Sequence, residues 1–187
     1  MEALHRLAAL GIHLPLRHAC NTGGFLDLPQ AHFDMVRLGI LPLGVYPSKV
    51  CRRIAGLKPI LSVKARIAAL QHIQPGDHVG YSMRYTADSP RTIAVLPVGY
   101  GDGLPRVRNA GHVLIHGHKA PIVGGNAMDA TMVDVTHIPE VRQWDETVLL
   151  GRQGEEEITA HDLAALGGTV SYDIMTKLGI RLQRVYE

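Results

Sequence analysis

The hydrophobic pattern of this chain changes near residue 45, and that change limits the folds open to it. Residues 2–10 place leucine and alanine at helical spacing before Gly11, and two short apolar runs follow at 13–20 and 34–40. A helix that leads into buried strands is typical of α/β proteins, in which strands pair in a parallel sheet or barrel. From Pro47 onward, short strand-like runs replace this pattern. The chain is therefore predicted to contain two kinds of structure.

The second part is predicted to be mainly β. Proline–glycine turns such as QPGD and GDGLP separate its strand-like runs, which are residues 61–70, 78–84, 91–100, 112–116, 119–123 and 131–135. Near the end, Thr159 is a typical helix N-cap, and Ser171 predicts the start of a further helix through Lys177. Residues 181–186 predict a final strand.

Composition excludes several classes of protein. An apolar share of 46% with 19% charged residues predicts a folded chain rather than a disordered one. The formal net charge of +2 offers no field for nucleic acid or for a membrane surface. No apolar run reaches the about 20 residues of a spanning helix, and Cys20 and Cys51 form no disulfide framework. We therefore expect a cytoplasmic protein without nucleic-acid or membrane partners.

General catalytic and metal motifs give little support for a function. The GYGDG segment lacks the spacing of a dinucleotide turn. His112, His116 and His118 would face the same way on one straight strand, but Gly117 interrupts the run and no carboxylate or cysteine lies close by. A solvated strand face explains these histidines better, so no metal is predicted.

Seven strings in order resemble one family. They are HACNTGG (18–24), FDMVRLGI (33–40), LKP (57–59), GYS (80–82), PVGYGDG (97–103), MDATMVDV (128–135), and SYD (171–173) with the ending RVY (184–186). Together they span essentially the whole chain, and they resemble the C-terminal half of alanine racemase. That family has a chain about twice as long, in which a βα barrel binds pyridoxal phosphate and a mainly β domain follows.

The resemblance implies a mainly β C-terminal domain with an N-terminal α/β fragment of a (β/α)8 barrel. Residues 1–45 would be the remnant of the pyridoxal-phosphate-binding barrel, and 46–187 the β domain. The α/β part is far shorter than the about 250 residues of a closed barrel. The implied partners are alanine as substrate and either a second copy in a homodimer or a complementing barrel half.

The resemblance also implies the residues that bind the cofactor. Arg37 would hydrogen-bond the pyridine nitrogen, and its permanent charge would keep that nitrogen unprotonated. The hydroxyl of Thr22, the backbone N–H groups of Gly39 and Ile40, and Tyr172 would hold the phosphate. Simpler roles stay open: Arg37 as a strand residue paired to a carboxylate, Thr22 as a helix N-cap, and Tyr172 as a packing residue.

Tyr81 matches the family tyrosine that exchanges the substrate Cα proton, on the face opposite the cofactor lysine. A phenol has an unperturbed pKa of about 10, so such a site would have to lower it. Tyr100, Met128 and Asp129 match residues that meet the substrate and narrow its entry, and the family uses all four on the opposite subunit. Cross-strand packing, core filling and turn chemistry are the simpler interpretations of these residues.

The sequence departs from the family at one decisive point. No lysine matches the one that forms the Schiff base, since the candidates fall elsewhere: Lys49, Lys58, Lys64, Lys119 and Lys177. Residues 125–127 and Leu104 also differ from the usual family residues, which leaves the substrate open. We therefore expect an alanine racemase half that is inactive alone. The alternatives are a non-catalytic β module that mediates association, and half of a racemase of broader specificity.

Overall fold

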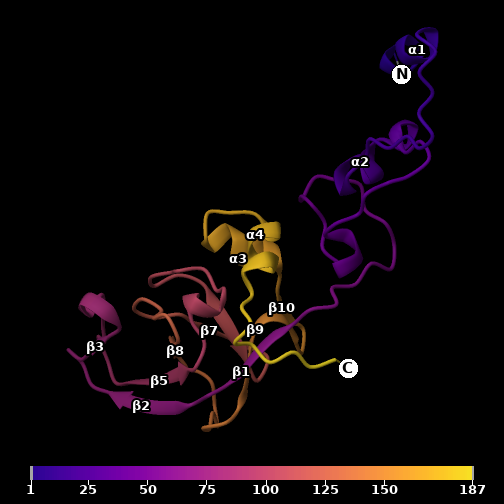
Figure 1. Cartoon of the computed structure of the whole chain (residues 1–187). Helices are drawn as coiled ribbons and strands as arrows, with labels where there is room; N and C mark the ends of the chain where they lie inside the picture. Colours follow the sequence, from indigo (N-terminus) through magenta and orange to yellow (C-terminus); the bar gives the residue numbers. More distant parts are fainter. Residues whose placement is uncertain (1, 187) are drawn as a thin grey trace. The chain divides into compact units, whose positions relative to one another are not determined.

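The computed structural model describes residues 2–186 of the chain (Figure 1). It contains two compact units, Met1–Lys58 and Pro59–Glu187, and each is described by itself. No helix among the described residues is long and apolar enough to cross a membrane.

The first unit contains short helices joined by irregular chain. They are α1 (Glu2–Ala9), α2 (Thr22–Asp27), η1 (Pro29–Ala31) and η2 (Leu41–Leu43). As predicted, α1 ends before Gly11, which has the positive φ of +73° that favours glycine. A small core joins Leu26 of α2 and Leu41 of η2 to Cys51. Elsewhere apolar side chains are exposed, among them Leu10 (74%), Ile12, Leu14 and Leu16.

The two strands predicted at 13–20 and 34–40 are wrong, because neither segment forms a regular ladder. Only two backbone hydrogen bonds join them, from Asp34 N to Arg17 O (3.1 Å) and from Arg37 N to Cys20 O (2.9 Å). Both bonds span 17 residues, so the segments run parallel, the sense expected in an α/β protein. A regular strand needs more paired neighbours than these two segments supply to one another.

The second unit is built from antiparallel strands, which confirms the mainly β prediction. One sheet joins β1 (Val63–Arg66), β9 (Glu146–Gln153), β6 (His112–Ile115) and β7 (His118–Pro121), and β10 (Glu156–Ile158) also pairs with β9. A second sheet has the order β2 (Ala69–Ile73), β5 (Arg91–Leu96), β8 (Thr131–Asp134), and β3 (His78–Val79) pairs with β4 (Tyr85–Thr86). The core includes Ile67, Leu96, Leu114, Val133 and Val148.

Several details of this unit differ from the prediction. The run at 61–70 is not one strand, because it divides into β1 and the start of β2, which lie in different sheets. The strands β9 and β10 were not foreseen. The run predicted at 78–84 gives way after β3 to the 3-10 turn η3 (Tyr81–Met83), because Gly80, Ser82 and Met83 have positive φ. The run at 112–116 ends at Ile115, since His116 and Gly117 form the turn to β7. Residues 181–186 form no strand, and Arg181 instead pairs with Asp102.

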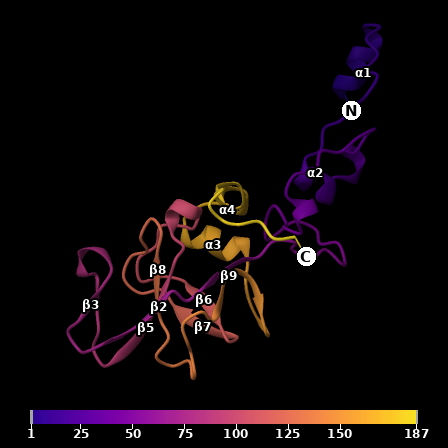
Figure 2. The same ribbon diagram turned by 60° about the horizontal axis from the view of Figure 1, so that its bottom comes forward.

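Two helices complete the unit and lie against one another, α3 (Ala160–Leu166) and α4 (Ser171–Lys177) (Figure 2). The predicted cap of α3 is confirmed: Thr159 accepts a hydrogen bond from Asp162 N, and the Asp162 carboxylate accepts one from Thr159 N. Ser171, by contrast, is the first residue of α4 rather than its cap, a position that Val170 takes.

Candidate functional site

Two loops of the second unit bring Tyr100 and Met128 together. Tyr100 begins the 3-10 turn η4 (Tyr100–Asp102), and its N–H donates to Ala127 O at 3.1 Å. The next N–H, of Gly101, donates to Met128 O at 2.8 Å. A Cβ on Gly99 would lie 2.2 Å from Ala127 O, so glycine is what allows this approach. The loops that carry these two predicted substrate-binding residues are therefore joined by two backbone hydrogen bonds.

The carboxylate of Asp102 fixes the η4 turn from within. It accepts the Gly99 N–H at 2.9 Å and two guanidinium bonds from Arg181, at 2.9 and 3.1 Å. Burial raises the pKa of Asp102, but the bonds from Arg181 and Gly99 outweigh burial and hold that pKa below its ordinary value. The hydrogen bonds to Asp102 and its charge raise the pKa of Arg181, and the charge of Asp129 adds a smaller effect. Sequence reasoning missed Arg181, whose partner lies 79 residues away.

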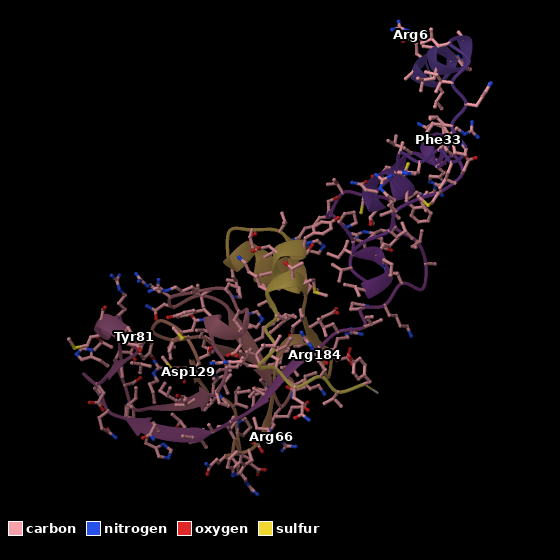
Figure 3. All side chains as sticks on the ribbon, in the orientation of Figure 1. Arg6, Phe33, Arg66, Tyr81, Asp129 and Arg184 are labelled. Carbon is pink, nitrogen blue, oxygen red and sulfur yellow. The ribbon has the colours of Figure 1, made fainter. Side chains whose placement is uncertain are left out.

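Tyr81 lies on η3, and its side chain is 73% exposed. Figure 3 shows Tyr81 on this turn and Asp129 on the loop that leads into β8. The backbone of Gly80 presses against the chain just before that loop, because a Cβ on Gly80 would lie 2.9 Å from Gly125 N. The residue before the turn of Tyr81 therefore contacts the chain three residues before Met128.

Further contacts connect α4 to the Tyr100 turn. A Cβ on Gly103 would lie 2.2 Å from Lys177 O, and Gly179 N donates to Asp102 O at 2.9 Å. Tyr172, on the same helix, has a side chain that is 39% exposed. The guanidinium of Arg106 lies 5.6 Å from the centre of the Tyr100 ring, a contact that sequence reasoning missed. Five predicted site residues thus lie in the second unit, namely Tyr81, Tyr100, Met128, Asp129 and Tyr172.

The first unit pairs two of the groups expected to bind phosphate. Thr22 is 3% exposed, and its Oγ1 accepts the Gly39 N–H at 3.1 Å. Ile40 follows directly and is equally buried. Thr22 does not cap α2, because Asn21 accepts the Gly24 N–H and takes that role. The hydroxyl of Thr22 can therefore still donate its own proton to a ligand.

Arg37 is fixed at both its backbone and its side chain. Its N–H donates to Cys20 O at 2.9 Å, and its Nη1 donates to Nδ1 of His18. His18 thus accepts at Nδ1, and the guanidinium keeps further N–H donors for another acceptor. Sequence reasoning missed His18, although it lies in one of the strings that carry the resemblance.

Among residues 2–186, no three histidine, cysteine, aspartate or glutamate side chains gather in a way that could hold a metal ion. Of the three histidines considered above, His112 has a pKa lowered chiefly by burial, and His116 Nε2 lies 3.0 Å from Asp145.

Comparison with known proteins gives the family. Residues 60–186 match the model of the alanine racemase C-terminal domain, and residues 1–47 match that of the alanine racemase N-terminal domain. The chain belongs to the alanine racemase family. The resemblance and the fold class inferred from the sequence are thereby confirmed.

Relatives named alanine racemase are similar along almost the whole chain. The protein of Syntrophobacter fumaroxidans is 45% identical over 179 residues, which are 95% of this chain and 48% of that protein. The protein of Halothermothrix orenii is 41% identical over 187 residues, which are 100% of this chain and 49% of that protein. This chain therefore spans about half the length of the curated alanine racemases that it matches.

Solved alanine racemase structures have the same fold. The Streptomyces coelicolor A3(2) enzyme superposes with a TM-score of 0.91 at 36% identity, over 99% of this chain and 49% of that one. The Bartonella henselae enzyme, solved with covalently bound pyridoxal phosphate, gives 0.87 at 32% identity, over 100% of this chain and 50% of that one. The Bacillus anthracis enzyme with bound L-Ala-P gives 0.86 at 31% identity, over 97% and 47%.

Proposed function

We propose that this chain is the C-terminal half of an alanine racemase, which interconverts L- and D-alanine in the cytoplasm and supplies D-alanine for the cell wall. In this proposal residues 1–45 are the edge of the cofactor-binding barrel and residues 46–187 are the β domain. The contacts among the loops of Tyr81, Tyr100 and Met128 support the proposal, because the resemblance assigns all three residues to the substrate.

The residues of the first unit fit pyridoxal phosphate. The buried hydroxyl of Thr22 lies beside Gly39 and would donate to the phosphate. Arg37, held by His18, keeps free N–H donors and would bind the pyridine nitrogen without giving it a proton. Tyr172 belongs to the second unit, and its proposed role is a phenolic hydrogen bond to a cofactor phosphate. When bound, pyridoxal phosphate withdraws electrons from the substrate Cα and makes its proton acidic.

In this proposal the second unit binds the substrate and moves the proton. The phenol of Tyr81 exchanges the proton at the substrate Cα on one face. The loop of Met128 and Asp129 meets the substrate carboxylate, and Tyr100 narrows the entry. These residues serve a cofactor held by another subunit, so a complete site requires a homodimer or a complementing barrel half.

The base for the opposite face is a lysine that none of the lysines in this sequence matches. We therefore propose that racemisation requires the barrel half, which also anchors the cofactor. The test uses this chain alone and this chain co-expressed with the barrel half of the Syntrophobacter fumaroxidans relative. The purified samples are assayed for conversion of L- to D-alanine and for pyridoxal phosphate absorbance.

The expected result is no conversion by the chain alone and measurable conversion by the co-purified pair. The Arg37→Leu variant, paired with the barrel half, should bind the cofactor but should no longer convert L- to D-alanine. Conversion by the chain alone would contradict the requirement for the barrel half. A pair that co-purifies with bound cofactor yet converts no alanine would contradict the racemase proposal.

Two alternatives have their own observations. The exposed side chains of Leu10, Ile12 and Leu14 favour an association module without catalysis, which predicts a pair that binds no cofactor. A broader substrate range is favoured by residues 125–127, which differ from the usual family residues. There Asn126 accepts from Val107 N and donates to Pro105 O, so the altered loop has its own fixed shape. Assays of the completed enzyme on serine and lysine test that range.

A further inference from the structure

Asn109 connects the turn of Tyr81 to the chain that leads to Met128. Its Oδ1 accepts the Gly124 N–H at 2.6 Å, and its own N–H donates to Gly124 O at 2.7 Å. Its Nδ2 donates to Arg84 O at 3.0 Å, one residue beyond the end of η3. One side chain therefore joins two segments that lie 40 residues apart in the sequence.

Asparagine is the side chain that can make all these contacts. Its carboxamide donates and accepts at the same time, whereas the carboxylate of aspartate only accepts. Its backbone has φ +46°, in the left-handed region that asparagine and glycine tolerate better than other residues. Alanine at this position would lose both side-chain bonds and strain the backbone.

The turn that carries Tyr81 has few other supports. Ser82 and Met83 have φ of +61° and +50°, which are sparsely populated conformations for such residues. All four residues 81–84 are exposed, so core packing does not hold them. The ladder between β3 and β4 closes the base of the turn, pairing Val79 with Tyr85. Beyond that ladder, the supports are the approach of Gly80 to Gly125 on one side and the bond from Asn109 to Arg84 O on the other.

We propose that Asn109 is a positioning residue that fixes the turn of Tyr81 against the loop of Met128, and so sets where the phenol meets the substrate. This inference rests on the proposed function, in which Tyr81 exchanges the Cα proton. Asn109 itself touches neither substrate nor cofactor; it acts through the backbone at Arg84 and Gly124.

Two substitutions separate the contacts. Asn109→Asp keeps the acceptor for Gly124 N but loses the donor to Arg84 O. It therefore removes only the bond to the turn of Tyr81. Asn109→Gly accepts the positive φ and loses both side-chain bonds. Glu140→Gly is the matched control, because Glu140 is also exposed and left-handed, with φ +58°, but lies in another loop.

The first measurement uses the full chain, with no cofactor, labelled with 3-fluorotyrosine. The chain has six tyrosines, and a Tyr81→Phe sample assigns the fluorine line of Tyr81. In Asn109→Asp this line should shift and narrow, while the exchange rate of the Gly124 amide stays the same. In Asn109→Gly the line should change in the same way, and the Gly124 amide should exchange about tenfold faster, as expected for the loss of one hydrogen bond. Glu140→Gly should change neither.

The second measurement uses the chain paired with the barrel half. Asn109→Asp should lower kcat about tenfold with KM within about twofold, and should increase the isotope effect of a Cα-deuterated substrate, because proton transfer becomes slower. An unchanged Tyr81 line in both Asn109 variants would overturn the inference, as would an equal loss of kcat in Glu140→Gly. If the wild-type pair does not racemise alanine, the proposed function fails, but the fluorine line still decides whether Asn109 positions Tyr81.

Discussion

Arg181 donates to both carboxylate oxygens of Asp102, whose side chain is only 4% exposed, at 2.9 and 3.1 Å. The same carboxylate accepts the N–H of Gly99 at the start of the turn that carries Tyr100. A residue near the C-terminal end thus holds a loop at the candidate site. The effect of the Arg181–Asp102 pair on stability is therefore measurable without substrate or cofactor.

The first prediction concerns Asp102→Asn. This change keeps an acceptor for Gly99 N but removes the charge that Arg181 binds, so we expect a loss of about 1–3 kcal/mol in the free energy of unfolding at pH 7. Urea denaturation measures this loss. Asp88→Asn is the control, because Asp88 forms an exposed pair with Arg91, and such a pair contributes about 0–1 kcal/mol.

The effect of Asp102 should also depend on pH. The folded-state pKa of Asp102 lies below its ordinary value, so its stabilisation is fully present above about pH 4, the ordinary range for aspartate, and is lost as the pH falls through the lowered value. The difference in unfolding free energy between the wild type and Asp102→Asn should therefore shrink below about pH 4. A difference that stays constant down to pH 2 would contradict the ion pair.

A second prediction concerns the pKa of Asp34. The side chain and backbone N–H of Arg17 donate to this carboxylate, and these bonds lower its pKa to about 2. Because the folded-state value is lowered, the pair stabilises the first unit above about pH 4 and is lost as the pH falls toward 2. An NMR titration of the carboxyl carbon should show this low value in the wild type and a value nearer 4 in Arg17→Gln.

A third prediction concerns Gly99→Ala. The added methyl group would lie 2.2 Å from Ala127 O, so the backbone bonds between the Tyr100 and Met128 loops would have to separate. We expect a loss of about 2–3 kcal/mol of unfolding free energy, the range of an overpacked site. Gly179→Ala is the control, since its nearest neighbours lie at an ordinary 3.6 Å. Equal stability of the two variants would show that the loops do not approach this closely.

A fourth prediction compares two tyrosines four residues apart. In the chain paired with a barrel half, Tyr81→Phe should lower kcat by about 10²–10⁴, the usual contribution of a general acid–base group. Tyr85→Phe should leave kcat within about threefold, because Tyr85 packs beside Val79 and Ile93, and burial raises the pKa of its phenol. Steady-state assays in both directions measure the two effects. Similar losses in both variants would remove Tyr81 from the proton transfer.

A fifth prediction concerns hydrogen exchange. We expect the amides of residues 1–45 to exchange faster than those of the sheets in the second unit, because leucines such as Leu10 and Leu16 are exposed and few backbone bonds join these segments. Mass spectrometry of peptides from the full chain measures the rates. Slowest exchange within residues 1–45 would contradict this expectation.

The parts of the fold that depend on neighbouring residues could be predicted from the sequence. Thr159 and Asp162 lie three residues apart and form a capping box. Gly117 lies in the turn after β6, as its type indicates, although β6 itself ends earlier, at Ile115. The segments at 13–20 and 34–40 have strand-like composition, but a strand exists only with hydrogen-bonded neighbours, and composition does not supply them.

Local sequence likewise predicts some residues of the candidate site and not others. Tyr81, Tyr100 and Met128 could be found because each lies in a recognisable string. Arg181 and Asn109 could not be found in this way, because their roles depend on distant partners. The partner of Arg181 lies 79 residues away, and the two partners of Asn109 lie 25 and 15 residues away. Such contacts follow from the topology of the sheets, and no local pattern encodes them.

The parallel segments at 13–20 and 34–40 of the first unit keep one register along their length. The bonds at Arg17 and Asp34, at Cys20 and Arg37, and at the side chain of Thr22 and Gly39 all have the same offset of 17 residues. This constant offset makes the segment a template with a fixed register. A strand that added to it with a slip of one residue would turn its inward side chains outward. The register at this edge thus decides which face of an added strand lies beside Thr22 and Gly39.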